Sequence, residues 1–486
     1  MRYFFLFFIF YFYSSANGQT TADRDSFSII NIACNTCIGQ PVSINTMEFI
    51  SGKVIVHDKS TVDISGKAKL KIFHAYPLSA FVIIENDSKT KYLRLYIEPR
   101  QEVKILLSND SISFDGNLKL VNKYLLELDM LGDKLVKQSN RLVGKFDKLS
   151  PEGQQDIQTN FGSEFQELNK AIENDNRIPE LAKEFLKYDN KFFIQRRKQA
   201  IVGLKFSSTE EKIDYSATFF FEEIPVCVTC LKVNIDSYDY FMSLNMDVYL
   251  DRSIFLSLKK DGKEADKDTL VLLIDKAIRN NTRTLLIREY LLAKNIFRKI
   301  KKYGISSNVR QIFDEFKKDY PSSEYTSVLE EEYDKDAALG EGMIAKNFKA
   351  DNIDGNKFAL EQLKGKIVYM DTWATWCLPC IEEFPQSIKM IKHFRNSAEV
   401  VFLFVSVDTN IKKWKDFVAS GKAPNGIHVN HNSHSEGVSV YDLYRMYGVP
   451  HYALIDKEGK IVKNRAPTPS SQITYQLINY VINNSK

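Results

Sequence analysis

The run Trp376-Cys377-Leu378-Pro379-Cys380 lies where a strand-like stretch, residues 366–370, gives way to helical periodicity. Pro379 suits the first turn of a helix, because a missing N–H costs nothing there. Cys377 should then lie at the helix N-terminus, where the helix dipole and unpaired N–H groups favour its thiolate. Cys380 follows one turn later and can resolve a mixed disulfide formed by Cys377. The run therefore predicts a redox-active dithiol with Cys377 as the attacking sulfur.

The segment from Gly342 to the C-terminus alternates strand and helix patterns, which indicates an α/β sheet. Strand-like runs occupy residues 366–370, 400–407, 452–455 and 460–462. Helical periodicity occupies residues 380–397, 412–420, 438–447 and 472–483. The turn formers Asp456-Lys457-Glu458-Gly459 separate the last two strand-like runs and predict a hairpin.

Two stretches flank the dithiol run, Asp371-Thr372-Trp373-Ala374-Thr375 before it and Ile381-Glu382-Glu383-Phe384-Pro385 after it, and Gly448-Val449-Pro450 precedes a later strand. Together these residues resemble the TlpA/ResA-type thiol-disulfide oxidoreductases of the thioredoxin superfamily. The resemblance covers residues 342–486 and implies a thioredoxin-like fold. A lone Cys-x-x-Cys would be weak support, but here the flanking Trp, the Pro and the distant proline loop occur in the expected order.

The resemblance also implies roles for the matching residues. Cys377 would be the nucleophile and Cys380 the buried, resolving thiol. Asp371 occupies the position of a buried acid, whose raised pKa would let it carry the proton of Cys380. Glu383 matches a second acid near the dithiol. Pro450 would follow a cis peptide bond and lie against Cys377.

The same resemblance implies a surface for the substrate. The backbone of Val449 and Pro450 would pair with an extended substrate segment, and Trp376 would cover the dithiol. The family often has Thr after the cis-proline, whereas this chain has His451. His451 could tune the thiolate, because His titrates in the right range. The alternative is a partly exposed ring at the rim of the substrate surface.

The length of the chain argues for several domains, because 486 residues are too many for one hydrophobic core. Residues 19–117 carry short strand-like runs separated by turn formers, which suits an all-β, sandwich-like domain. Residues 118–341 place apolar side chains at helical spacing and predict a helical middle domain. We therefore expect a multidomain chain that ends in an α/β thioredoxin-like domain, residues 342–486.

The N-terminus is typical of a secretory signal. An apolar and aromatic run, residues 3–13, follows Met1-Arg2, and small residues follow at 14–18, so residues 1–18 are predicted to be a signal peptide. The alternative is a short membrane-embedded helix, but a span needs about 20 apolar residues. We expect an exported protein of the periplasm or cell envelope, with no membrane span after signal removal. The net charge of +4 gives no reason to expect nucleic acid as a partner.

Six cysteines form three pairs of identical spacing. Cys34/Cys37 and Cys227/Cys230 lack the Trp and Pro that flank the third pair, and the β-branched residues at 224–230 suggest a loop or short strand. Export favours structural disulfides, in any of three connectivities, and a cross-link between the two pairs would tie the β domain to the helical domain. A Cys₄ zinc site and a redox relay to Cys377/Cys380 are the alternatives.

Three histidines, His428, His431 and His434, recur in a Gly/Asn/Ser-rich stretch. Such a group can suggest a metal site, but metal sites usually need a fixed scaffold. We expect neither a metal nor another cofactor.

The sequence thus predicts an exported thiol-disulfide oxidoreductase. The resemblance implies that it reduces protein disulfides, with thiol or disulfide groups of proteins as substrates and a membrane-bound electron donor. One alternative is a binding or scaffold protein of the envelope that carries the thioredoxin module as an accessory. Another is a disulfide isomerase.

Overall fold

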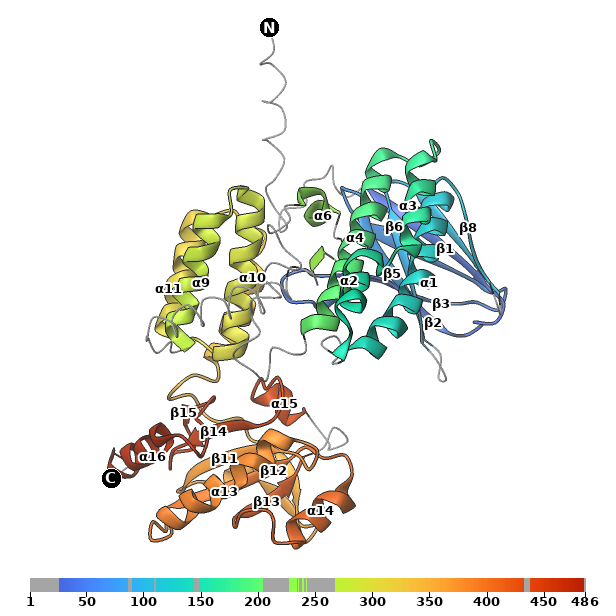
Figure 1. The fold of residues 1–486 in the computed structure, drawn as a ribbon. Helices are drawn as coiled ribbons and strands as arrows, with labels where there is room; N and C mark the ends of the chain where they lie inside the picture. Colours follow the sequence, from blue (N-terminus) through green and yellow to red (C-terminus); the bar gives the residue numbers. More distant parts are fainter. Residues whose placement is uncertain are drawn as a thin grey trace. The chain divides into compact units, whose positions relative to one another are not determined.

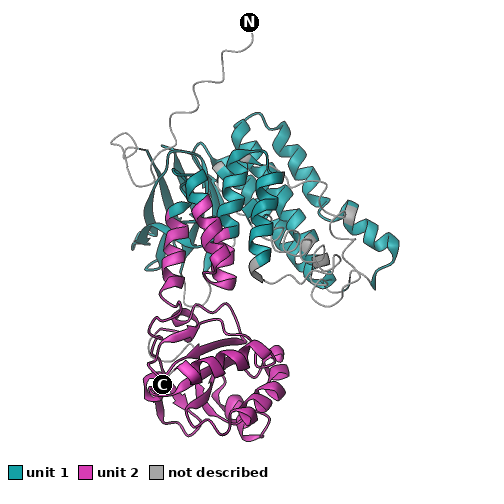
Figure 2. Ribbon diagram, turned by 90° about the vertical axis from the view of Figure 1, so that its left-hand side faces the viewer, with its two compact units in different colours: residues 1–295, 316–326 teal, residues 296–315, 327–486 magenta. Residues whose placement is uncertain are grey.

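The computed structural model describes residues 26–85, 90–108, 111–143, 145, 148–203, 227–233, 235, 238–239, 242, 267–431 and 438–484 (Figure 1). The predicted signal peptide and His434 lie outside these residues. The chain divides into two compact units (Figure 2). Unit 1 comprises residues 1–295 and 316–326, and unit 2 comprises residues 296–315 and 327–486. The helical segment therefore contributes residues to both units.

Unit 1 begins with two four-stranded sheets, as the sequence predicts for its β-rich part. One sheet has the order β4-β1-β7-β8 and the other β3-β2-β5-β6. The strands are β1 (Phe27–Cys34), β2 (Pro41–Met47), β3 (Val54–Thr61), β4 (Lys67–Phe73), β5 (Leu78–Ile84), β6 (Lys91–Ile97), β7 (Glu102–Leu107) and β8 (Ile112–Asp115). Burial alternates along β4 and β7, so one face of each strand contributes to the core and the other meets solvent.

Helices follow the sheets in unit 1. They are α1 (Lys119–Leu142), α2 (Pro151–Asn160), α3 (Glu164–Asn174), α4 (Glu180–Gly203), α6 (Val228–Lys232) and α9 (Lys267–Asn281). Polar groups join α1 to the neighbouring sheet, because the buried Asn122 amide bonds both the N–H and the C=O of Tyr96, at 2.8 and 3.1 Å. Arg94 of β6 also forms ion pairs with Asp129 of α1 and Asp189 of α4.

The remaining helices are α10 (Leu285–Tyr303), α11 (Ser307–Asp319) and α12 (Thr326–Ala337). The first two cross from one unit to the other along the chain, and α12 begins at the end of a unit 1 segment. No helix among the described residues is long and apolar enough to cross a membrane.

Unit 2 contains a seven-stranded sheet in the order β10-β9-β13-β12-β11-β14-β15. Its elements are β9 (Lys349–Asn352), β10 (Lys357–Ala359), β11 (Ile367–Trp373), α13 (Leu378–His393), β12 (Val400–Ser406), α14 (Ile411–Ala419), β13 (Ile427–Asn430), α15 (Val440–Leu443), β14 (His451–Ile455), β15 (Ile461–Lys463) and α16 (Gln472–Asn484). β11 is buried along its whole length, parallel to β12 and antiparallel to β14. This is the α/β thioredoxin-like domain that the sequence predicts.

Two local predictions were wrong. The helix predicted at residues 438–447 is only the single turn α15, because Arg445 takes the left-handed φ of 51°, which a helix does not continue through. The stretch around Cys227 is not a strand there: Cys227 is the N-cap of α6, and Val228–Lys232 are helical. The β-branched residues of this short helix have low helix propensity, but propensity is a weak determinant and the Cys227 cap favours the helix.

Candidate redox site

Cys377 and Cys380 lie at the junction between β11 and α13. Cys377 is the N-cap of α13, and its sulfur accepts a hydrogen bond from the Cys380 N–H, with 3.2 Å between the two atoms. Pro379 occupies the first turn, as the sequence predicts. The two residues are joined as a disulfide, with Cα atoms 5.3 Å apart, and only 4% and 1% of their surfaces are exposed. The structure thus shows the oxidised form of the dithiol, with Cys377 at the positive end of a helix.

The loop that leads into Cys377 is held by a buried carboxylate that sequence reasoning missed. Asp408 Oδ2 accepts from the Thr375 N–H at 2.9 Å, and Oδ1 accepts from the Thr375 hydroxyl at 2.7 Å. Ser406 at the end of β12 donates to the same carboxylate at 2.9 Å. A signal was present in the sequence, because Ser406 and Asp408 interrupt an apolar strand at its carboxyl end, where α/β sheets place functional groups.

Asp371 lies within β11 and is 2% exposed. Burial raises the pKa of its carboxyl well above the ordinary value, and the negative charge of Glu383 raises it further. Among the described residues, no group donates a hydrogen bond to its Oδ1 atom. Tyr452 lies opposite Asp371 in the neighbouring strand, and burial together with the Asp371 charge raises the pKa of that phenol. Asp371 is therefore a buried carboxyl with a raised pKa on the strand that leads into the dithiol.

Glu383 lies one turn after Cys380 on α13 and is half-buried. Its carboxylate accepts from the backbone N–H of Ser470 at 3.1 Å and from the Ser470 hydroxyl at 2.8 Å. Its charge reaches Asp371, whose pKa it raises. The two predicted acids are therefore electrostatically coupled, while only Asp371 lacks contact with solvent.

The peptide bond between Val449 and Pro450 is cis. It directly precedes β14, whose first residue, His451, pairs with Thr372 of β11. Val449 packs against the core that also contains Cys377. The proline loop and the dithiol are thus brought together by adjacent strands, although Gly448 and Cys377 are far apart in the sequence.

The other two predicted substrate residues differ in exposure. Trp376 is 62% exposed, so its ring lies on the surface beside the buried sulfurs. His451 is largely enclosed and hydrogen-bonds with Asn464; burial, followed by the positive charge of Arg465, lowers the pKa of its imidazole to about 4. The ring is therefore neutral at physiological pH.

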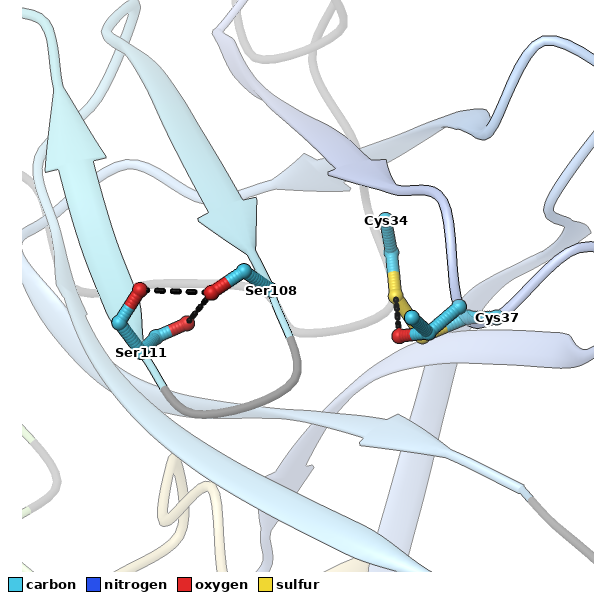
Figure 3. The surroundings of a disulfide bond; sticks show 5 residues. Cys34, Cys37, Ser108 and Ser111 are labelled. Carbon is cyan, nitrogen blue, oxygen red and sulfur yellow. Dashed lines mark hydrogen bonds between the residues drawn. A yellow bond between two sulfur atoms is a disulfide. The ribbon is translucent and has the colours of Figure 1, made fainter.

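Each of the other cysteine pairs is closed on itself. Cys34–Cys37 and Cys227–Cys230 are disulfides within their own pairs, so neither pair cross-links the β-rich and helical segments. Figure 3 shows Cys34 and Cys37 of the first pair. The Thr36 hydroxyl lies 3.5 Å from the Cys34 sulfur. The described residues hold no group of three or more His, Cys, Asp or Glu side chains that could hold a metal ion.

His428 and His431 belong to the core of unit 2. His428 stacks on Phe404, with ring centroids 4.9 Å apart, and its Nε2 lies 2.8 Å from the Pro424 carbonyl oxygen. His431 packs edge-on against Phe348. Burial lowers the pKa of both rings. These two histidines are aromatic core residues at the end of β13.

Comparison with known proteins finds one family model and several relatives that match part of the chain. The family described as Redoxin matches residues 340–477. The thiol-disulfide oxidoreductase ResA of Bacillus subtilis is 29% identical over 144 residues, covering 30% of this chain and 77% of that protein. ResA of Bacillus anthracis is 31% identical over 124 residues, covering 25% and 67%. A crystal structure described as a putative thiol-disulfide oxidoreductase from Bacteroides vulgatus is 34% identical and covers 30% of this chain and 99% of that one, with a TM-score of 0.28.

Proposed function

The chain belongs to the ResA/TlpA-type thiol-disulfide oxidoreductases of the thioredoxin superfamily, and on that premise we propose that it reduces disulfides of protein substrates outside the cytoplasm. The observation that carries this proposal is the Cys377 sulfur at the N-cap of α13, which follows the strand that holds the buried Asp371 and pairs with the strand after the cis-proline. A helix N-terminus favours the thiolate, which is the form that attacks a disulfide.

The reaction begins from the reduced dithiol. The Cys377 thiolate attacks one sulfur of a substrate disulfide, so a Cys377 mixed disulfide forms and the first substrate thiolate leaves. The Cys380 thiol then loses its proton and attacks Cys377, which closes the Cys377–Cys380 disulfide and releases the second substrate thiolate. Two electrons pass from the enzyme to the substrate, and the substrate thiolates take up protons. Renewal of the dithiol needs a two-electron thiol donor, for which we propose a membrane-bound protein.

Asp371 is the residue proposed to move the proton of Cys380. A raised pKa makes the Asp371 carboxylate a stronger base than an ordinary one, so its ionised form accepts the proton of Cys380 and later releases it to solvent. Burial of Asp371 and the charge of Glu383 both raise its pKa in this direction. Glu383 is then the group that tunes Asp371, because its own carboxylate is held by Ser470 at the surface.

The substrate surface is proposed to lie around the cis-proline. Backbone groups of Val449 and Pro450 would pair with an extended segment of the client, as an added strand pairs with an edge. The exposed Trp376 ring offers apolar area beside Cys377. A surface of this kind accepts a protein chain more readily than a small molecule, because most of the contacts are with backbone.

Export and domain organisation complete the proposal. The apolar leader at residues 3–13 and the small residues after it support cleavage near residue 18. The patterns at residues 19–117, 118–341 and 342–486 support a β-rich, a helical and a redox domain. Expression with the native leader, followed by N-terminal sequencing of protein recovered outside the cytoplasm, tests the first point; retention of Met1 in that fraction would contradict cleavage.

The experiment that tests the function is reduction of insulin by the mature chain, with a thiol donor in excess. Wild type should turn over, and Cys377→Ser should lose turnover by about a thousandfold or more, because the nucleophile is absent. The reduction potential of the Cys377/Cys380 couple fixes the direction: near −270 mV it supports a reductase and near −120 mV an oxidant. Wild type without turnover, or turnover that survives Cys377→Ser, would favour the scaffold function instead.

A further inference from the structure

Helix α12 buries two acidic side chains one turn apart. Glu332 and Asp336 are 7% and 5% exposed, although Glu and Asp are rarely buried without partners. Glu332 Oε1 accepts from Nη2 of Arg445, and the Tyr447 hydroxyl lies 3.5 Å from the same oxygen. Asp336 Oδ1 accepts from Nη2 of Arg465 at 2.8 Å. All these groups belong to unit 2, where ion pairs join Glu332 and Asp336 to Arg445, and Asp336 to Arg465.

The two arginines bracket the cis-proline loop in the chain. Arg445 and Tyr447 come directly before Gly448-Val449-Pro450, and Arg465 follows the next hairpin. Asn464, the neighbour of Arg465, donates to the Tyr444 carbonyl at 3.1 Å and also hydrogen-bonds with His451. α12 therefore contacts residues on both sides of the cis-proline loop: Arg445 before it and Arg465 after β15.

Arg445 needs these contacts more than an ordinary residue would. Its φ of 51° is a left-handed conformation that costs free energy in a residue with a side chain. The surrounding structure must hold such a residue in place. Its guanidinium, mostly buried, contacts Glu332 and lies within 4.0 Å of Asp336, so removal of either acid leaves a buried positive charge with less compensation.

We propose that Glu332 and Asp336 are positioning residues for the substrate-contacting loop at 448–451, and that α12 is thereby part of the redox module in function. This inference rests on the proposed function of that loop. Both acids lie before residue 340, where the Redoxin match begins, so the device is supplied by the segment that precedes the family domain. It gives the helical segment a specific task, which is to set the geometry in which a client strand is held.

The sharpest test is Glu332→Gln, which keeps the side-chain volume and removes the charge. The matched control is Glu331→Gln on the same helix, because Glu331 pairs with Lys335 at an exposed site, where 52% of its side chain is accessible. We expect Glu332→Gln to raise KM for a protein disulfide about tenfold with little change in kcat. A change of about tenfold is typical when one site affects binding at another. The reduction potential and the reaction with a small aromatic disulfide should match wild type, since neither needs the loop.

Hydrogen exchange provides a readout that does not depend on activity. In Glu332→Gln and in Asp336→Asn, backbone amides of residues 445–452 should exchange faster, while those of β11 and β12 should not change. Exchange at 445–452 equal to wild type, or an equal rise in Glu331→Gln, would overturn the positioning role. If wild type fails to reduce insulin, the proposed function fails while this exchange test still decides whether α12 holds the loop.

Discussion

Two helices of this protein begin with a Cys-x-x-Cys disulfide, and they share their local geometry. In α6 the Cys227 sulfur accepts from the Cys230 N–H at 3.2 Å, and in α13 the Cys377 sulfur accepts from the Cys380 N–H at the same distance. The Cα separations are 5.2 and 5.3 Å. Both pairs are almost fully buried. Spacing, capping and burial therefore do not distinguish a structural disulfide from a redox site.

The difference lies in what surrounds each pair. α13 has 16 residues with Pro379 in its first turn, whereas α6 has five residues and no proline. A longer helix presents a larger dipole to its N-terminal sulfur. The carboxylate that accepts a hydrogen bond from α6 is Glu184, which is exposed and lies 3.3 Å from the Thr229 hydroxyl. Asp371, on the strand that leads into α13, is buried and has a raised pKa with no cation paired to it among the described residues, whereas the buried acid after α6, Asp239, is paired with Lys294.

The largest expected effect comes from removing each pair in turn. Cys377→Ser/Cys380→Ser should abolish insulin reduction, with a loss of about a thousandfold or more, because no mixed disulfide can form. Cys227→Ser/Cys230→Ser should retain turnover and instead lose stability, by about 2 kcal/mol for so short a loop. Turnover and urea denaturation of both double variants measure the two quantities. A large loss of turnover in the second variant would mean that Cys227 and Cys230 relay electrons.

The sequence predicted the redox half of this comparison well. Local motifs of this family are specific, so two of them were enough to predict the fold: the run Trp376–Cys380 and the distant Gly448-Val449-Pro450. They also predicted that residues of β11, α13 and the loop before β14 form one site. The resemblance to the ResA/TlpA family is confirmed. Periodicity also predicted the two-sheet start and the helical middle of the chain.

The sequence could not show contacts that depend on the tertiary fold. The strand end marks Asp408 as a candidate, but nothing local identifies Thr375 as its partner, since 33 residues separate them. The pairing of Glu332 with Arg445 is likewise nonlocal, and two charged residues on a helix usually face solvent. The short helix α6 was not predicted either, because its β-branched residues have low helix propensity.

A smaller effect is expected from Asp371→Asn, which removes the buried acid of the strand that leads into α13. The resolving step should slow by about a hundredfold at neutral pH, because Cys380 loses its proton acceptor. Rapid-quench measurement of the mixed disulfide detects this directly. Asp416→Asn is a suitable control, because Asp416 is an exposed acid paired with Lys412. Equal rates in wild type and Asp371→Asn would remove the proton-transfer role.

The same variant should change how stability depends on pH. The raised pKa means that folded protein keeps a proton at Asp371 that the unfolded chain releases near pH 4. Stability from this proton is complete below the unfolded pKa and is lost as pH rises through the folded pKa. Asp371→Asn removes that loss, so the variant should gain stability relative to wild type on going from pH 4 to pH 9. Urea midpoints at several pH values measure the difference, and parallel curves would contradict it.

The smallest expected effect concerns His451→Thr, which restores the residue common in the family. Thiolates at helix N-termini have a pKa between about 3.5 and 7.5, and an imidazole with a pKa of about 4 is neutral over most of that range. A neutral ring adds little to the field at Cys377, so ultraviolet titration of the thiolate should give the same pKa in both proteins. A pKa raised in the variant would instead make His451 a charged partner of the thiolate. The His451 ring hydrogen-bonds with Asn464, whose neighbour Arg465 pairs with Asp336. His451→Thr removes the first of these contacts, so it should raise KM for a protein client. The site at α13 would then differ from α6 in the geometry of its proline loop as well as in charge.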